Sequence, residues 1–493
     1  MSRDISRRQA LTLGLAGAGS LGVGLAGLGA RGWPPFGAVS GDISSTLTDG
    51  TAATGTRAWT EPQVLTSTKG VLDVDLRIAE TLVQIGGQTA TMLTYNGTVP
   101  GPTLHLRPGD RLQVHLTNDL DEPTNLHTHG LVVSPMGNSD NPFLRIGPGE
   151  SFDYEIDLPD DHPTGVFWYH PHHHGLVADQ VFAGLYGAIV VDDQDWAATA
   201  PHVVLVSDTT ITSGQVAKVS AVERMQGRVG QTVLTNGLVA PDLIAAAGST
   251  QRLLVINACT SRYLDLGLDG HRLRVRGLDS GAFSPPVTQE RVLVPPGGRA
   301  DLELDVPVDR TGFIAHAYDR GVAGMGMMGG GSLAGSDATV LTLVPGGSGI
   351  AEVPSAASTA PRDLRGVQVD RTRTLTFTMG MGGMRGMQFL IDGQAFDPER
   401  VDQQVQLGTV EEWTIRNTTM MDHPFHLHVW PMQVIEASGT APERVDVRDV
   451  VDVPGGQQTV VRIAFERYAG TTVYHCHILD HEDLGMMGVI AAE

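Results

Sequence analysis

Short runs in which apolar and polar residues alternate recur along the chain. Arg111–Thr117 alternates throughout, and so does the second half of Val410–Ile415. This two-residue period is typical of a strand with one buried face, and Pro-Gly and Gly-Asp turn signals separate such runs. Helical periodicity is scarce. The pattern therefore predicts an all-β fold built from Greek-key β-sandwiches.

A second pattern repeats at long intervals. A polar residue and a glycine open a segment that passes through an apolar strand and ends in asparagine. The three segments run from Asn96-Gly97 to Asn118, from Asn236-Gly237 to Asn257, and from Asp392-Gly393 to Asn417. In a chain of 493 residues this predicts three copies of one domain, at residues 59–195, 200–345 and 371–493. A linker at 346–370, rich in Gly, Pro, Ser and Ala, joins the last two.

Residues 1–30 are expected to be an export signal and not part of the fold. Arg7 and Arg8 precede a Gly- and Ala-rich apolar stretch, which looks like a bacterial twin-arginine signal. A membrane anchor is the competing interpretation, and the many glycines and short apolar length disfavour it. Residues 31–58 then form a linker, and no later segment is apolar enough to span a membrane. We expect twin-arginine export to the periplasm, cell surface or extracellular space, with no membrane span in the mature protein.

Charge and cysteine content narrow the choice of partners. The formal net charge is −22 with no basic run, which argues against nucleic acid as a partner. The chain holds two cysteines. Cys259 ends an apolar run and is typical of an inert buried cysteine. Cys476, by contrast, lies between two histidines near the C-terminus.

The segment from His475 to Met486 places one thiol, three imidazoles and a thioether close together. A Cys and two His with a long axial Met form a blue-copper electron-transfer site. Cys476, His481 and Met486 could supply all but one of these ligands. Side chains at i and i+2 of a strand share one face. His475 and His477 therefore point away from Cys476, toward a second site.

Further histidines for that second site also occur in pairs. Three more His-x-His pairs bring the total to eight imidazoles, enough for three copper ions: His127-Thr128-His129, His170-Pro171-His172 and His426-Leu427-His428. His423 stands three residues before the last of these pairs and completes the two-His requirement of the Cys476 site. The sequence therefore predicts four copper ions, one of them apart from the other three.

With these motifs the chain resembles the multicopper oxidases, the family of laccases, bilirubin oxidases and bacterial cuprous oxidases. The matching segments follow the family's order: Asn125–Gly130, Trp168–His172, His423–His428 and the Cys476 segment. The resemblance implies three cupredoxin domains, with a three-copper cluster between the first and third. It implies a type 1 copper bound by His423, Cys476, His481 and an axial Met486. Type 2 copper would bind His127 and His426. The type 3 coppers would bind His129, His170 and His477, and His172, His428 and His475.

The resemblance also implies a reaction. Four one-electron oxidations of phenols, aromatic amines or Cu(I) would be coupled to reduction of O2 to water, with a role in copper tolerance. Oxygen reduction consumes protons, so a carboxyl group is expected near the cluster. Glu482 matches a family position implicated in proton delivery, and Asp140 is a second candidate, with a loop-turning role as its alternative. Competing functions are a bilirubin-oxidase-like or Mn(II) oxidase, and a non-catalytic copper-binding cupredoxin protein.

Methionines gather in two Gly-rich segments. Seven of the sixteen fall within Gly324–Gly329 and Met379–Met387. Thioethers prefer Cu(I), so these segments are candidates for contact with substrate copper, and flexible surface loops are the alternative. The candidates in the second segment are Met379, Met381, Met384 and Met387. Met421 matches a substrate-copper ligand of the cuprous oxidases, but Thr419 stands where that family has Asp.

Overall fold

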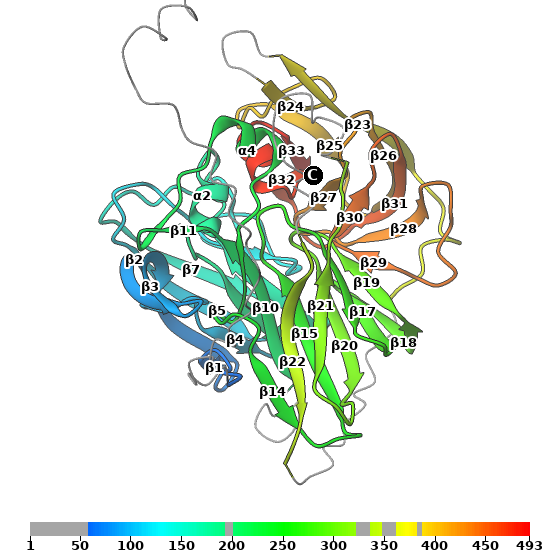
Figure 1. The fold of residues 1–493 in the computed structure, drawn as a ribbon. Helices are drawn as coiled ribbons and strands as arrows, with labels where there is room; N and C mark the ends of the chain where they lie inside the picture. Colours follow the sequence, from blue (N-terminus) through cyan, green and yellow to red (C-terminus); the bar gives the residue numbers. More distant parts are fainter. Residues whose placement is uncertain (1–57, 193–200, 322–335, 348–360, 382–386) are drawn as a thin grey trace, which may run out of the picture. The chain divides into compact units, whose positions relative to one another are not determined.

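The computed structural model describes residues 58–192, 201–321, 336–347, 361–381 and 387–493. Several predicted features lie outside the described residues: the export signal, most of the linker after it, Gly324–Gly329, Met384, the side chain of Met381 and positions 348–360 of the second linker. The described residues are mainly β-strands, which confirms the predicted all-β class. In Figure 1 the strands follow the chain from blue through green to red.

The first sandwich has two sheets. In order from one edge to the other, one sheet consists of β1 (Val64–Thr66), β4 (Thr103–Leu106), β9 (Gly187–Val191), β8 (Gly165–His170) and β6 (His127–His129). In the same manner, the other consists of β11 (Ile211–Thr212), β12 (Gln215–Val216), β3 (Gln88–Tyr95), β2 (Val71–Ile85), β5 (Arg111–Asn118) and β7 (Ser151–Asp157).

The second sandwich is built in the same way. One sheet consists of β13 (Thr232–Thr235), β10 (His202–Thr209), β15 (Thr250–Asn257), β20 (Arg299–Asp305), β17 (Leu273–Leu278) and β18 (Gly281–Gln289). The other consists of β14 (Asp242–Ala245), β22 (Ala338–Pro345), β21 (Thr311–His316), β16 (Leu264–Leu268) and β19 (Arg291–Val294).

The third sandwich carries the C-terminal motif. One sheet consists of β24 (Met387–Ile391), β23 (Arg371–Met381), β26 (Thr409–Asn417), β31 (Gln458–Phe465), β28 (Met432–Ala437) and β29 (Val447–Arg448). The other consists of β25 (Val401–Val405), β33 (Met487–Ala492), β32 (Gly470–Cys476), β27 (His423–Leu427) and β30 (Val450–Val453).

The long repeat has a structural cause. Its opening residue takes a left-handed backbone conformation before a glycine, as a tight hairpin turn requires, and its side chain accepts a backbone N–H from the neighbouring strand. Asn96 has a φ of 54° and accepts from the Arg77 N–H. Asn236 has a φ of 49° and accepts from the Leu205 N–H, and Asp392 has a φ of 54° and accepts from the Thr376 N–H. The closing asparagine donates its amide to a carbonyl across the sandwich. These carbonyls belong to Ile146 for Asn118, Val294 for Asn257 and Val453 for Asn417.

Buried apolar side chains fill each sandwich. Along β2, Leu72, Val74 and Leu76 are buried while the residues between them are exposed, so one strand face supplies the core. A further apolar cluster joins the sandwiches, because Trp168 of the first packs with residues of the second and with Leu479 of the third. The core therefore continues across the junction where the histidine motifs meet.

One hairpin crosses between predicted domains. Strands β11 and β12 lie within the 200–345 range, but β12 pairs with β3 of the first sandwich, with Gln215 opposite Thr91. The Thr91 N–H also donates to the Gly214 carbonyl at 2.9 Å. The start of the second segment therefore completes a sheet of the first.

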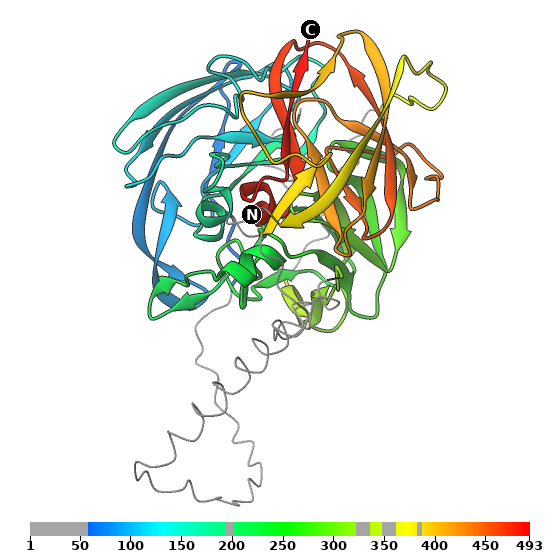
Figure 2. The same cartoon turned by 90° about the horizontal axis from the view of Figure 1, so that it is seen from above.

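Three short helices lie at the junction: α2 (Val177–Phe182), α4 (Ala221–Gln226) and α5 (Leu479–Asp483). The Asp483 carboxylate at the end of α5 accepts backbone N–H groups of Gly175 and Ala178 at the start of α2, at 2.7 and 2.9 Å. Arg228, just after α4, pairs with Asp480 of α5 at 2.6 Å. In Figure 2 the red α5 lies between the blue-to-cyan strands and the orange strands. No helix among the described residues has both the length and the apolar character to cross a membrane.

Candidate metal centre

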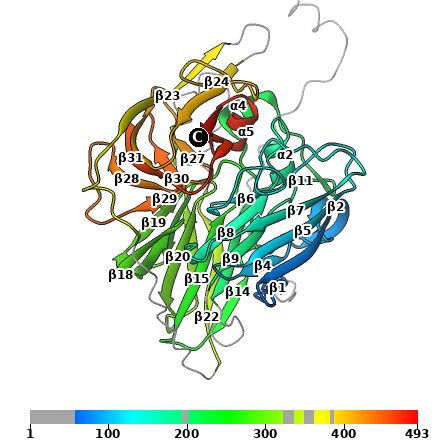
Figure 3. The same cartoon turned by 180° about the vertical axis from the view of Figure 1, so that it is seen from behind.

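The four His-x-His pairs come from two sandwiches. On the first, β6 pairs with β8 so that His127 lies opposite His170. On the third, β27 pairs with β32 so that His426 lies opposite His475. In Figure 3, β6 and β8 lie near β27 and α5. We call the eight buried residues the histidine cluster: His127, His129, His170, His172, His426, His428, His475 and His477.

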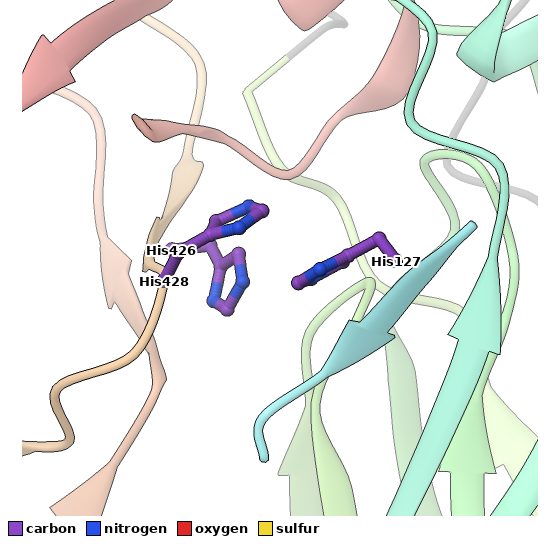
Figure 4. Close-up of side chains that lie close together, drawn as sticks. All are labelled: His127, His426 and His428. Carbon is purple, nitrogen blue, oxygen red and sulfur yellow. The ribbon is translucent and has the colours of Figure 1, made fainter. Parts of the chain in front are cut away.

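Rings of the two sandwiches stack on one another. His127 stacks on His428, and His129 on His426, with ring centroids 3.9 Å apart in both pairs. Figure 4 shows His127, on β6, facing His426 and His428 of the third sandwich. The first and third sandwiches therefore supply four of the eight rings each, as the sequence predicts.

The ring nitrogens converge in overlapping groups. Nε2 of His475 lies 3.2 Å from Nε2 of His172 and 3.3 Å from Nε2 of His428. In three groups, one nitrogen from each ring lies within 4.8 Å of the others: His127, His426 and His428; His127, His129 and His170; and His172, His428 and His475. His477 completes the cluster, with its ring centroid 4.8 Å from that of His129.

The donor set fits copper. Five buried Nε2 atoms have no hydrogen-bond partner among the described residues, those of His127, His129, His170, His426 and His477. Leaving such an atom unpaired costs about 1–3 kcal/mol. Burial lowers the pKa of these five rings, to about 3 for His170, and it also lowers the pKa of His172, to about 4. Neutral imidazole is the form that binds metal, and it suits copper.

The two carboxyl groups that the sequence predicts, those of Asp140 and Glu482, lie beside the cluster. Both oxygens of Asp140 are 3.0 Å from Nδ1 of His127, and burial raises the Asp140 pKa to about 7. Glu482 lies 3.1 Å from Nδ1 of His475 and 3.5 Å from Nε2 of His172. Burial acts to raise the pKa of Glu482, but the neighbouring imidazoles outweigh it and the net shift is downward. The structure thus brings together both carboxyl groups that the sequence singles out.

Sequence reasoning missed a third carboxylate. The Asp449 backbone carbonyl accepts from Nδ1 of His426 at 2.8 Å, and its carboxylate lies 3.3 Å from Nδ1 of His129. Arg299 of the second sandwich holds that carboxylate with two hydrogen bonds of 2.6 Å. Arg299 also donates to the Val166 carbonyl of the first sandwich at 3.2 Å. Neither residue lies in a motif, so the sequence offers no signal for either.

A second donor group lies entirely within the third sandwich. Nδ1 of His423 is 3.4 Å and Nδ1 of His481 is 4.0 Å from the Cys476 sulfur. The two nitrogens are 3.2 Å apart. Met486 is buried in the same apolar core, and its carbonyl accepts the Cys476 N–H at 3.0 Å. We call these four residues the Cys476 pocket.

Neighbouring groups fix the rings of this pocket. The Thr419 hydroxyl lies 2.9 Å from Nε2 of His423. The Met225 carbonyl, on α4, lies 3.2 Å from Nε2 of His481. Phe389 stacks on the His481 ring with centroids 3.8 Å apart. With each Nε2 engaged elsewhere, both Nδ1 atoms are directed at the Cys476 sulfur, an orientation that prepares a metal site.

Comparisons with known proteins agree with this geometry. Multicopper oxidase sequence profiles match residues 77–195 and 368–493. The multicopper oxidase mco of Staphylococcus haemolyticus is 30% identical over 413 residues, which cover 81% of this chain and 83% of that protein. The chain belongs to the multicopper oxidase family. Like other multicopper oxidases, it is an oxidoreductase that uses copper.

Solved multicopper oxidase structures share the fold. The Campylobacter jejuni multicopper oxidase, described as a metallo-oxidase, superposes with a TM-score of 0.75 at 27% identity, over 88% of this chain and 96% of that one. A laccase-like multicopper oxidase from Ochrobactrum has a TM-score of 0.76 at 25% identity and covers 88% of this chain and all of its own. The prediction of three cupredoxin-like sandwiches is confirmed.

The methionines proposed to contact substrate copper differ in how deeply they are buried. Met379 and Met387, on β23 and β24, are partly buried against the third core. In the hairpin register, Met381 lies opposite Met387. Met421 is fully buried, and its sulfur lies 4.0 Å from Nη1 of Arg320. Cys259 is buried with its sulfur 3.8 Å from the Val206 carbonyl, in keeping with an inert core thiol.

Proposed function

We propose that this multicopper oxidase couples four one-electron oxidations to the reduction of O2 to water, using four copper ions. The Cys476 pocket would hold the type 1 ion, and His127 and His426 the type 2 ion. The two type 3 ions would bind His129, His170 and His477, and His172, His428 and His475. The decisive support is the convergence of eight buried imidazoles on the opposite side of β32 from the Cys476 thiol.

When bound, copper at these two places supplies one-electron transfer at the first and oxygen reduction at the second. The protein's contribution begins with the backbone of β32. It places the Cys476 thiol and the His475 and His477 rings on opposite faces, joined by the bonds of adjacent residues. The fixed rings of His423 and His481 keep the pocket in one geometry, which suits electron transfer with little rearrangement.

Protons are supplied by the two carboxyl groups beside the cluster. Asp140 touches His127, and its pKa of about 7 lets it hold or release a proton near neutral pH. Glu482 contacts His475 and His172 of the other side of the cluster. We propose both as proton relays. The same contacts also hold the His127 and His475 rings in a fixed orientation.

The proposed donors are phenols, aromatic amines and Cu(I), with a role in copper tolerance. The Ochrobactrum relative is described as active on lignin model compounds, and the Campylobacter relative as a metallo-oxidase. For Cu(I), the segment Met379–Met387 is better supported than Met421, because the buried Arg320 cation next to Met421 opposes a second cation there. The alternatives are a bilirubin-oxidase-like or Mn(II) oxidase and a non-catalytic copper-binding protein.

The domain boundaries 59–195, 200–345 and 371–493 and twin-arginine export by residues 1–30 remain part of the proposal. Export as a folded protein suits a chain that binds its metal before secretion. Fusion of residues 1–58 to a reporter that is active only after folded export tests the signal, with Arg7→Lys and Arg8→Lys together as the control that should abolish export.

Oxygen uptake separates the candidate activities. Copper-loaded protein is given a phenol, Cu(I) or Mn(II), and Cys476→Ser is tested in parallel. We expect uptake with the phenol and Cu(I), and none in the variant. No uptake with any donor would favour the copper-binding protein, and uptake with Mn(II) alone would favour the manganese oxidase.

The methionine segment is tested by changing Met379, Met381, Met384 and Met387 to Leu. We expect the rate with Cu(I) to fall while the rate with a phenol is kept. Met136→Leu, at an exposed methionine of the first sandwich, is the matched control. Undiminished Cu(I) oxidation in the fourfold variant would contradict the substrate role of this segment.

A further inference from the structure

A buried arginine of the second sandwich lies against the Cys476 pocket. Arg320 follows β21 and is only 4% exposed. Its Nη1 lies 4.0 Å from the Met421 sulfur, two residues before His423. Its backbone carbonyl accepts the Asp422 N–H at 2.8 Å. Arg320 is therefore held against the segment Met421–Asp422, which leads directly into His423 of the pocket.

Arg320 is not neutralised locally. Its Nη2 donates to the backbone carbonyls of Gln226 and Gly227. Among the described residues, no carboxylate oxygen is paired with it within 4.0 Å. The Asp422 carboxylate already accepts the Tyr318 hydroxyl and the Gly455 N–H, both at 2.8 Å.

Other buried arginines of the molecule have a carboxylate. Arg228 is paired with Asp480 and Arg299 with Asp449, each at 2.6 Å. A buried charge without a partner costs several kcal/mol. Folding against that cost, with only carbonyl oxygens as acceptors, indicates that the Arg320 charge serves the site beside it.

The contacts of Arg320 reach the neighbours of both pocket histidines. On one side, the Met421 sulfur beside Nη1 belongs to the segment that leads into His423. On the other side, Nη2 donates to the carbonyl that follows Met225 in the chain, and the Met225 carbonyl itself lies 3.2 Å from Nε2 of His481. The guanidinium is therefore positioned between the surroundings of His423 and those of His481.

We propose that Arg320 sets the reduction potential of the Cys476 site by raising it. This inference rests on the proposed function, because it requires a type 1 copper in that pocket. The oxidised ion carries one positive charge more than the reduced ion. A fixed cation in a buried, low-dielectric setting therefore destabilises the oxidised form. Arg320 is a positioned charge and not a ligand.

Redox titration of the blue absorption band in the copper-loaded protein tests the proposal. Arg320→Gln keeps a donor for the two carbonyls and removes the charge, and Arg320→Met is a second neutral variant. We expect the equilibrium constant for one-electron reduction to fall at least tenfold in both, about 59 mV for one electron. Arg320→Lys should stay within threefold of the wild type.

Arg252→Met is the matched control, because Arg252 is a paired arginine on β15, bonded to Asp301 at 2.8 and 2.9 Å. The reduction potential of the Cys476 site should not change in this control variant. An unchanged potential in the neutral Arg320 variants would overturn the proposal, as would an equal fall in Arg320→Lys. A fall accompanied by a distorted blue spectrum would indicate a structural role and count against it. Absence of a blue band in the wild-type protein would instead contradict the proposed function.

Discussion

The Cys476 pocket and the histidine cluster lie on opposite sides of β32, but they are assembled differently. The pocket takes its four side chains from β27, β32, α5 and the residue before β33, all in one sandwich. The cluster takes half of its rings from the first sandwich and half from the third. The ligands of the first site all come from one folded sandwich, whereas those of the second meet only when two sandwiches dock correctly. Substitutions should therefore be able to remove one site and leave the other.

Cys476→Ser should have the largest effect on activity. Loss of a neighbour that only supports a ligand costs about 10–100-fold, and loss of the thiolate itself should exceed that, with oxidation of every donor below one hundredth of the wild-type rate. Oxygen uptake and the blue band should disappear together. Copper analysis should still find the cluster ions, because their rings lie on the other face of β32. Loss of all copper would contradict the separation of the two sites.

Arg299→Met should have the converse effect. It leaves the buried Asp449 carboxylate without its partner, which costs about 3–5 kcal/mol, and it loosens the contacts that orient His129 and His426. We expect loss of cluster copper and of oxygen reduction, with the blue band retained. Paramagnetic resonance and copper analysis measure this. Arg252→Met is the control, and equal loss of both sites in Arg299→Met would show that they are not independent.

Asp140→Asn tests chemistry within the cluster. The amide keeps a polar contact with His127 but cannot deliver a proton. A general acid contributes about 10²–10⁴-fold, so reoxidation of the reduced enzyme by O2 should slow by about 100-fold. Reduction of the Cys476 site by a phenol, followed as loss of the blue band, should keep its rate. That step occurs on the other side of β32. Stopped-flow traces of the two half-reactions measure both rates, and equal slowing of both would refute this role.

His162 of the first sandwich should give a smaller, pH-dependent effect on the stability of the protein. Its Nε2 accepts the Val132 N–H at 3.0 Å, and Nδ1 donates to the Pro163 carbonyl at 2.9 Å. Burial lowers its pKa from 6.5 to about 4. Its contribution to stability is therefore present above pH 6.5 and is lost as pH falls toward 4. Between pH 7 and 5 the wild type should lose about 2 kcal/mol through this group.

Denaturant unfolding at the two pH values, with His162→Gln as the comparison, measures that loss. The variant should lose about 2 kcal/mol less than the wild type over this interval, because its amide does not titrate. The same loss in both proteins would show that acid acts elsewhere.

The sequence was informative where chemistry follows local spacing. In a strand, consecutive side chains point to opposite faces, which fixes the faces of His475, Cys476 and His477. Two adjacent sites could therefore be predicted from three consecutive residues. The turn pairs such as Asn96-Gly97 likewise announce the repeat, because only certain residues suit that backbone. Which ring binds which ion stays a prediction, as do the roles of Asp140 and Glu482.

Residues that act through docking gave no such signal. Arg299 and Arg320 approach the third sandwich from the second, and Met225 reaches His481 from a short helix. Their neighbours in the chain are ordinary strand and loop residues, and their partners in the third sandwich are more than a hundred positions away. Only tertiary packing brings them to the metal sites, so no local pattern could identify them.

The β11–β12 hairpin has a consequence for any attempt to divide the chain. A fragment that ended near residue 195 would contain the histidines of the first sandwich but would leave β3 as an open sheet edge. Unpaired backbone groups along such an edge invite pairing with another molecule. The first sandwich should therefore aggregate when expressed without residues 211–216, and extension of the fragment past Val216 should restore its solubility.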